Sequence, residues 1–308
     1  HRRKQLIVVG GSGMLGNEIV RHFSQNDSYD VISLQRNSEE VQFPNNVDVR
    51  SIDITDEPSF GEFLEISKPD LIINCAALVD LDLCESDFNL AIKVNCDTLK
   101  IIRKYSGKSK LVHISTDSVF NGTHGNYSET DSVDPLNNYA KSKYKGELAA
   151  LDIESSIIIR TNIFGFHQQK GKASLAEWAL ENLTQKIKIN GFEDVYFNPV
   201  YTGQLSLVVE NLILVDFSGL INVGSDEYIS KFDFLKKLAG TYFLDPGLIR
   251  AKSVSEMMFK AERPQNTTLN TGYLTNILGY TPSLLEGLKM FFTDRVNFIK
   301  IRNANNSN

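Results

Sequence analysis

The sequence is poor in cysteine, in positive charge and in long apolar runs, and each shortage narrows the possible functions. Cys75, Cys84 and Cys96 are odd in number and lack metal-ligand spacing, so we expect packed, reduced thiols and the cytoplasm as compartment. No apolar run approaches the ~20 residues of a membrane span, and the first residues, His1-Arg2-Arg3-Lys4, lack the apolar region of a signal peptide. We therefore expect no membrane partner. The net charge of −6 gives no reason to expect nucleic acid.

Histidine is also scarce, and the five copies are scattered along the chain. None stands at metal-ligand spacing from Cys, Asp or Glu, so we expect no catalytic metal. The sequence has no nucleophile elbow, which leaves little support for Ser-His-Asp hydrolysis. The 308 residues, 42% of them hydrophobic, suffice for a large domain with a smaller one attached.

What the chain does have is an apolar strand followed at once by crowded glycines, Leu6-Ile7-Val8-Val9-Gly10-Gly11-Ser12-Gly13-Met14-Leu15-Gly16. Gly11, Gly13 and Gly16 satisfy GxGxxG, and Gly10, Gly13 and Gly16 satisfy GxxGxxG. Glycine permits a tight turn and a close approach of the backbone to a pyrophosphate, and the helix that follows offers free N–H groups. The strand, turn and helix together predict a dinucleotide site, although a structural turn is the alternative.

Strand and helix signals alternate through the first half of the chain. This alternation predicts an α/β fold with a doubly wound parallel sheet, in which ligands bind at the carboxyl ends of the strands. We expect strands over 30–34, 47–52, 71–74, 110–115, 156–160 and 220–224, and helices over 57–66, 88–105, 138–151, 173–185, 205–216, 232–242, 271–278 and 283–292. The polar tail 303–308 is expected to be disordered.

The pattern loosens after residue 164, which predicts a second, smaller, mixed α/β domain. We assign residues 1–164, with return segments at about 196–225, to a dinucleotide-binding Rossmann domain. We assign about 165–195 and 226–308 to a substrate domain. The substrate domain would cap the carboxyl edge of the sheet and form one wall of a cleft.

The residue after the second expected strand indicates which dinucleotide binds. An acidic residue at this place is typical of NAD sites, but the chain has Arg36 there. A guanidinium suits a 2′-phosphate, which favours NADP(H) over NAD(H), although a solvated loop arginine is the alternative. Asp53, after the third strand, could contact the adenine amino group.

Tyr139 and Lys143 stand four residues apart and therefore share one helical face. An adjacent ammonium is expected to lower the pKa of a phenol from its usual value near ~10, which would suit proton exchange. Such a pair also arises by chance or as a surface helix contact. A hydroxyl of the segment Ser115-Thr116-Asp117-Ser118-Val119-Phe120, at the carboxyl end of the fifth strand, could share a substrate oxygen with Tyr139.

The order of these features resembles the extended short-chain dehydrogenase/reductase family. Within it, the chain resembles the dTDP-4-dehydrorhamnose reductase group over nearly its whole length, and most densely from Gly10 to Thr161. The segments that carry the resemblance are Asn74-Cys75-Ala76-Ala77, Val94-Asn95, Ser115-Thr116-Asp117, Val119-Phe120, Pro135-Leu136-Asn137-Asn138-Tyr139, Ser142-Lys143, Gly146-Glu147, Ile159-Arg160-Thr161, and Arg263-Pro264 followed by Leu269.

The resemblance implies an NADPH-dependent reductase of a nucleotide-linked 4-keto-6-deoxy sugar, with NAD(H) as a possible second cofactor and a homodimer as a possible assembly. Thr116, Tyr139 and Lys143 would be catalytic. Asp117 would help to place the sugar, and Arg263 would bind the nucleotide pyrophosphate, with a structural salt bridge as its alternative. The cofactor site would take in Gly10, Gly13, Met14, Leu15, Gly16, Arg36, Asp53, Ile54, Ala76, Tyr139 and Lys143.

Two departures from the group leave the sugar open. Ser118 stands where the group usually has Tyr, and Asn162-Ile163 stands where it has Ser-Trp; we expect Ser118 and Asn162 to line the sugar side. Related dehydratases carry Glu at the place of Ser118, and its loss counts against a dehydratase. A nucleotide-sugar epimerase remains an alternative. So does a non-catalytic NADP-binding subunit, since the regulatory subunit of methionine adenosyltransferase resembles the same group.

Overall fold

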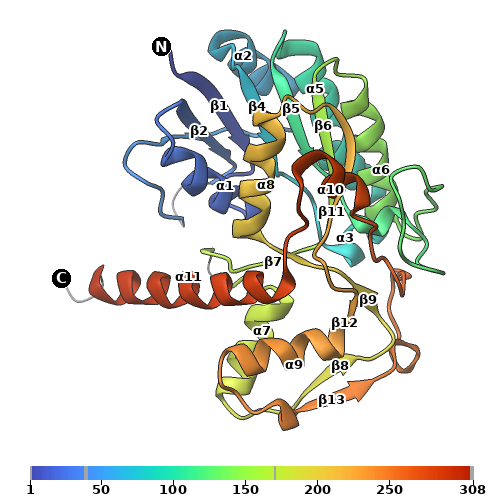
Figure 1. The fold of residues 1–308 in the computed structure, drawn as a ribbon. Helices are drawn as coiled ribbons and strands as arrows, with labels where there is room; N and C mark the ends of the chain where they lie inside the picture. The colour runs from blue at the N-terminus through green and yellow to red at the C-terminus, as the bar shows by residue number, and fades with distance from the viewer. Residues whose placement is uncertain (1, 38–40, 170, 306–308) are drawn as a thin grey trace.

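The computed structural model describes residues 2–37, 41–169 and 171–305, with the backbone alone for 300–305. Its centre is a seven-stranded, wholly parallel sheet with the order β11-β6-β5-β4-β1-β2-β3 (Figure 1). This architecture confirms the predicted doubly wound α/β fold. The strands are β1 (Lys4–Val9), β2 (Tyr29–Gln35), β3 (Asp48–Ser51), β4 (Leu71–Asn74), β5 (Lys110–Ile114), β6 (Ser156–Thr161) and β11 (Gly219–Val223).

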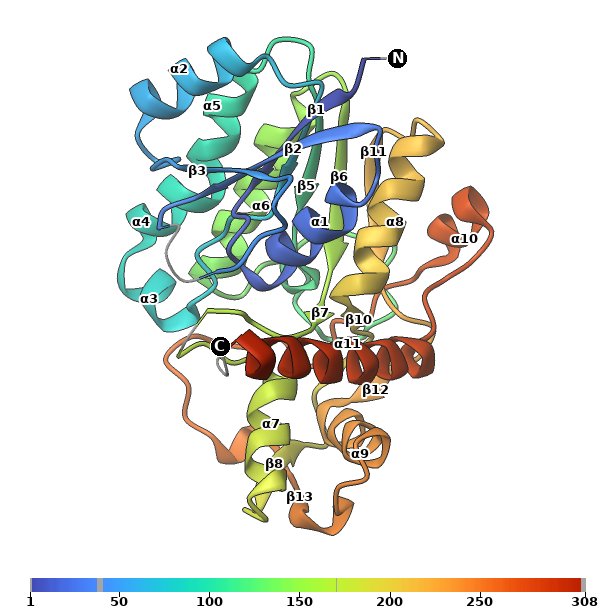
Figure 2. The same cartoon turned by 90° about the vertical axis from the view of Figure 1, so that its left-hand side faces the viewer.

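Helices cover both faces of this sheet, as Figure 2 shows. On one face, α1 (Met14–Ser24) and α8 (Thr202–Leu214) enclose a core that includes Phe23 and Val208. On the other face, α2 (Glu57–Ser67), α5 (Thr98–Tyr105) and α6 (Asn138–Leu151) enclose a core around Phe60. The strands other than the edge strand β3 lie largely buried between two helical layers, which explains their mainly apolar sequences.

A smaller body lies beyond the carboxyl edge of the sheet (Figure 1). It has its own aromatic core, centred on Phe164, Phe234 and Phe291. Its helices are α7 (Leu175–Thr184), α9 (Lys231–Thr241) and the first turns of α11 (Leu284–Asn305). Its short strands pair as β7 (Ile163–Phe164) with β10 (Val200–Tyr201), β8 (Ile189–Phe192) with β13 (Ile249–Lys252), and β9 (Tyr196–Phe197) with β12 (Ile229–Ser230).

Three expectations about elements were wrong. The single helix expected over 88–105 is interrupted: α4 (Phe88–Ile92) leads into a π-helical turn at Lys93–Asp97 before α5 begins. A short helix that was not expected, α3 (Leu81–Ser86), precedes it, whereas α10 (Gly272–Leu278) agrees with the helix expected over 271–278 and packs on the sheet core through Leu274. Helix α11 continues to residue 305 instead of ending at Phe292, because Phe298 still packs on the aromatic core. Residues 303–305 of the expected disordered tail are therefore helical, and 306–308 lie outside the described residues.

Within the described ranges, no helix has both the length and the apolar character needed to cross a bilayer.

Candidate active site

The glycine turn after β1 forms the floor of a pocket of about 460 Å³ at the carboxyl edge of the sheet. Gly10 has φ +81°, and a Cβ atom there would lie 2.7 Å from the backbone nitrogen of Ala76, so only glycine fits. Gly13 lines the same pocket and is the N-cap residue of α1. A Cβ on Gly16 would collide with the carbonyl of Gly10, so Gly16 lets α1 pack on the turn. The turn has the shape that a phosphate cradle requires.

The pocket brings together most of the residues that the sequence analysis assigned to a cofactor. Those lining it are Gly10, Gly13, Arg36, Asp53, Ile54 and Ala76. Asp53 accepts hydrogen bonds from the backbone N–H and the hydroxyl of Thr55, and these lower the pKa of its carboxyl. Leu15 points into the sheet core instead, and Met14 is not a lining residue. At Leu15 only the backbone at the start of α1 remains available to a ligand, whereas Met14 is partly exposed.

Three further lining residues carried no sequence signal. Gln35, the last residue of β2, is 3% exposed and accepts a hydrogen bond from Ser33 through Oε1 at 2.9 Å. Its amide Nε2 has no partner among the described residues. Gln169 and Lys172 come from the loop after β7, and Gln169 donates to the Ser12 hydroxyl at 3.1 Å. Only the folded chain brings this distant loop over the glycine turn.

Helix α6 supplies the predicted tyrosine and lysine. Asn137 caps it by accepting from the N–H of Ala140, and the helix runs over the predicted residues, Asn138–Leu151. Lys143 is buried, and its Nζ donates to the carbonyl of Ile114 at 2.7 Å, at the end of β5. Burial lowers the pKa of Lys143 to about 8. The lysine is thus fixed beside the strand that leads to Thr116.

The expected lowering of the Tyr139 pKa was wrong for the protein without ligand. Burial raises the pKa of this phenol to about 12, while the neighbouring Thr116 hydroxyl acts in the opposite direction. The ammonium of Lys143 is directed at the Ile114 carbonyl and does not offset the burial. Tyr139 is consequently a protonated phenol at neutral pH and suited to donate a proton.

Asp117 is the centre of a buried hydrogen-bond cluster beside Thr116. Its Oδ2 accepts from Asn162 at 3.0 Å and from Thr267 at 2.6 Å, and its Oδ1 accepts from Thr116 at 3.3 Å. Ser118 also faces Oδ1, at 3.4 Å. Burial raises the pKa of Asp117, and the hydrogen bonds oppose this effect. The cluster joins the predicted residues Asp117, Ser118 and Asn162 to Thr267, which comes from the C-terminal region.

Two cations lie on the small-body side of this cluster. Lys231, at the start of α9, places its Nζ 5.6 Å from the ring centre of Phe197. The charges of Asp117 and Arg263 both act on this ammonium. Burial lowers the pKa of Lys231, and Arg263 lowers it further. The Cζ atom of Arg263 lies 3.9 Å from the ring centre of Phe259. Arg263 forms no salt bridge with the described carboxylates, which contradicts the alternative that it is a structural salt-bridge residue. The sequence analysis missed Lys231 because it lies in a weakly patterned region.

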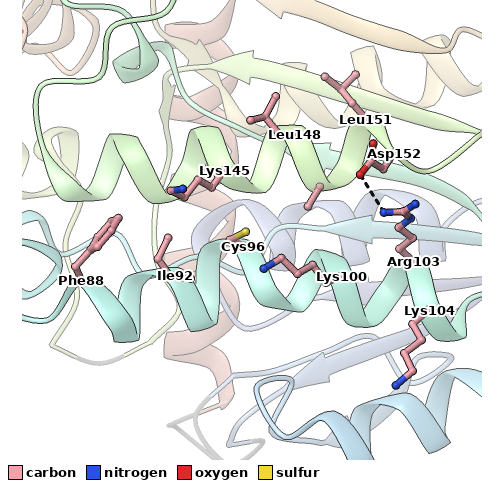
Figure 3. A pocket seen from close by; sticks show the side chains of 11 residues that line it. Phe88, Ile92, Cys96, Lys100, Arg103, Lys104, Lys145, Leu148, Leu151 and Asp152 are labelled. Carbon is pink, nitrogen blue, oxygen red and sulfur yellow. Dashed lines mark hydrogen bonds and ion pairs between the residues drawn. The ribbon is translucent and has the colours of Figure 1, made fainter.

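A larger hollow than this pocket, about 990 Å³, lies elsewhere. Figure 3 shows it between α4, α5 and α6, where the Arg103–Asp152 ion pair spans it at 2.9 Å. Its lining residues include none of the predicted site residues. Volume therefore does not identify the active site, whereas the carboxyl edge of the sheet combines the glycine turn, the Tyr–Lys pair and the buried aspartate.

Comparisons with known proteins identify the family of the chain. The chain is 29% identical to the "Probable low-salt glycan biosynthesis reductase Agl14" of Haloferax volcanii, covering 91% of this chain and 94% of that protein. It is 26% identical to methionine adenosyltransferase 2 subunit beta of Danio rerio, covering 88% and 84%. A crystal structure of a hypothetical dTDP-4-dehydrorhamnose reductase from Sulfolobus tokodaii superposes with a TM-score of 0.79 at 32% identity, covering 92% and 98%. The model of the RmlD substrate binding domain matches residues 4–295, and the chain therefore belongs to that family.

Proposed function

We propose that the protein is an NADPH-dependent reductase of a nucleotide-linked 4-keto-6-deoxy sugar. The observation that carries the proposal is that Tyr139 lies beside Thr116, while Lys143, four residues along the same helix, donates to the end of β5 near Cys75 of the glycine-lined pocket. The names of two relatives, a glycan biosynthesis reductase and a hypothetical dTDP-4-dehydrorhamnose reductase, support this substrate class.

The residues around the pocket fit a phosphorylated dinucleotide. The absence of a Cβ at Gly10 and the N–H groups at the start of α1 suit a pyrophosphate. Arg36, at the pocket rim, would bind the 2′-phosphate, and Lys143 would bind the nicotinamide ribose. NADPH, when bound, supplies the hydride that reduces the ketone.

The proton in the proposed reaction comes from Tyr139. Its raised pKa keeps the hydroxyl protonated, which is the form that donates a proton to the oxygen at C4. Thr116 would donate a hydrogen bond to the same oxygen and so polarise the ketone. Asp117, held by Asn162 and Thr267, would accept from a sugar hydroxyl, and Lys231 with Arg263 would bind the diphosphate.

The division into a cofactor domain and a substrate domain belongs to the same proposal. It is supported by the separate core of the small body. A cytoplasmic location is supported by the three free thiols, and a homodimer is the expected assembly.

The likeness to a methionine adenosyltransferase subunit supports a second candidate, a binding subunit without turnover. The Tyr139–Lys143 pair and the adjacent Thr116 favour the enzyme, because a binding subunit needs no proton donor. An epimerase would use the same pair but would consume no NADPH.

The first experiment follows NADPH absorbance with a panel of nucleotide 4-keto-6-deoxy sugars. We expect the wild-type protein to consume NADPH with one sugar, and Tyr139→Phe to lower kcat by about 10²–10⁴-fold, since it removes the proton donor. Tyr144→Phe on the same helix is the matched control and should keep full activity. NADPH binding without consumption across the panel would contradict the proposal of a reductase. Epimerase and partner-binding assays would then follow.

A further inference from the structure

Two buried charges beneath the active site have no part in the reaction proposed above. Glu147 on α6 is 1% exposed and Arg160 on β6 is 3% exposed. The guanidinium holds the carboxylate through both oxygens, with Nε–Oε1 at 3.0 Å and Nη2–Oε2 at 2.8 Å. Ser115 donates to Oε1 at 2.6 Å, which completes the shell of the carboxylate.

The pair joins the elements that carry the three candidate catalytic residues. Glu147 lies one helical turn from Lys143 and two turns from Tyr139, on the same face of α6. Ser115 directly precedes Thr116. Arg160 lies 5.1 Å from the ring centre of Phe120, which follows the short helix bearing Asp117. One ion pair therefore links α6, the end of β5 and β6.

A buried ion pair is weak evidence for stability, because apolar residues of similar volume often stabilise a core as well. A charge-based role for this pair must act on a nearby charge, and Lys143 is the candidate. The titratable or charged groups that act on Lys143 or lie around it are Tyr139 and Glu147 on α6, Cys75 after β4, His113 on β5 and Arg160 on β6. Glu147 is the one carboxylate among them.

We propose that Glu147 is a positioning residue that keeps Lys143 in its charged form, and that Arg160 and Ser115 set the strength and direction of this effect. The inference rests on the proposed role of Lys143 in holding the nicotinamide ribose. It explains why a charged pair lies here, although the buried residues of α6 other than Lys143 and Glu147 are small.

The sign of the effect follows from the charges. Burial lowers the pKa of Lys143 to about 8, and Glu147 opposes this by raising it. Lys143 is charged below its pKa and loses its charge as the pH rises through it, so binding that needs the ammonium weakens above about pH 8. Glu147→Gln removes the negative charge and leaves that of Arg160, which moves the alkaline limit to lower pH. Arg160→Gln leaves the carboxylate unneutralised, which moves the limit to higher pH.

The test measures the Lys143 pKa directly in the full-length protein by NMR of ¹³Cε-labelled lysine, with Lys143→Met to assign the signal. The dissociation constant of NADPH is measured against pH in parallel. We expect Glu147→Gln to lower the Lys143 pKa by about one pH unit and Arg160→Gln to raise it. Asp152→Asn, which removes an exposed carboxylate from the C-cap of the same helix, is the matched control and should move neither quantity.

A purely structural pair would give equal losses in both variants without opposite shifts, and that result would overturn the inference. If Glu147→Gln does not fold, Glu147→Asp is used instead, since it retains the charge at a greater distance. It should lower the Lys143 pKa by a smaller amount. An unchanged Lys143 pKa in this variant also overturns the inference. The NMR titration needs no sugar substrate, so a failure of the reductase proposal is seen separately, as absent turnover with the opposite shifts intact.

Discussion

We expect the choice between NADPH and NADH to depend on a few atoms at the end of β2. Arg36 places a guanidinium at the rim of the glycine-lined pocket, next to the buried Gln35 amide. A charge-assisted contact to a 2′-phosphate is lost with the arginine, whereas a ribose hydroxyl loses little. We expect Arg36→Ala to weaken NADPH binding by about tenfold and NADH binding by less than twofold, as measured by fluorescence titration.

Arg50→Ala is the matched control, because this exposed arginine on the neighbouring strand pairs with Asp48 and does not line the pocket. Equal losses of NADPH and NADH affinity in Arg36→Ala would show that the 2′-phosphate assignment is wrong.

Lys231 offers a test of the substrate side. The Arg263 guanidinium adds to the effect of burial in lowering the pKa of Lys231, and an anion bound near both cations would relieve this repulsion. Lys231→Met keeps the length of the side chain and removes the charge. We expect the affinity for a free nucleoside diphosphate to fall about tenfold, while that for NADPH stays within twofold, both measured by calorimetry.

Lys237→Met removes an exposed lysine of the same helix, one that pairs with Glu227, and should change neither affinity. A loss of NADPH affinity in Lys231→Met would instead place Lys231 in the support of the cofactor site.

At the scale of elements, the sequence predicts those features that depend on residues close together in the chain. The β1 strand, the glycine turn and α1 follow one another without a gap, and the Tyr139–Lys143 helix has the predicted bounds because Asn137 caps it. These features depend on neighbours in the chain, so their residue patterns are sufficient.

The π turn at Lys93–Asp97 could not be predicted, because its reason lies elsewhere in the fold. It places Asn95 so that the side chain binds the backbone N–H and C=O of Leu78 and the hydroxyl of Ser142. Leu78 is itself a pocket residue. The same holds for Gln169 and Thr267, which reach the site only through long-range packing. The proposed site at this edge thus includes residues whose local sequence gives no sign of their place in it.

At the scale of the whole molecule, the two bodies have separate cores, and we propose that they have separate tasks. The aromatic core of the small body contains no residue that lines the glycine-lined pocket. The core between the sheet and α2, by contrast, includes Phe60 and packs against Ile52 and Ile54, which do line it. A cavity in one core should therefore disturb one ligand more than the other.

This difference leads to a paired prediction. Phe291 is fully buried, with the Phe164 and Tyr201 rings 5.7 and 5.6 Å away, so Phe291→Ala should lower the free energy of unfolding by about 3–5 kcal/mol. Phe60→Ala should cost a similar amount in the other core. We expect Phe291→Ala to weaken nucleoside diphosphate binding more than NADPH binding, and Phe60→Ala to do the reverse. Thermal unfolding gives the stabilities and calorimetry gives the affinities. Equal effects of both variants on both ligands would contradict the proposal that one body binds the cofactor and the other the substrate.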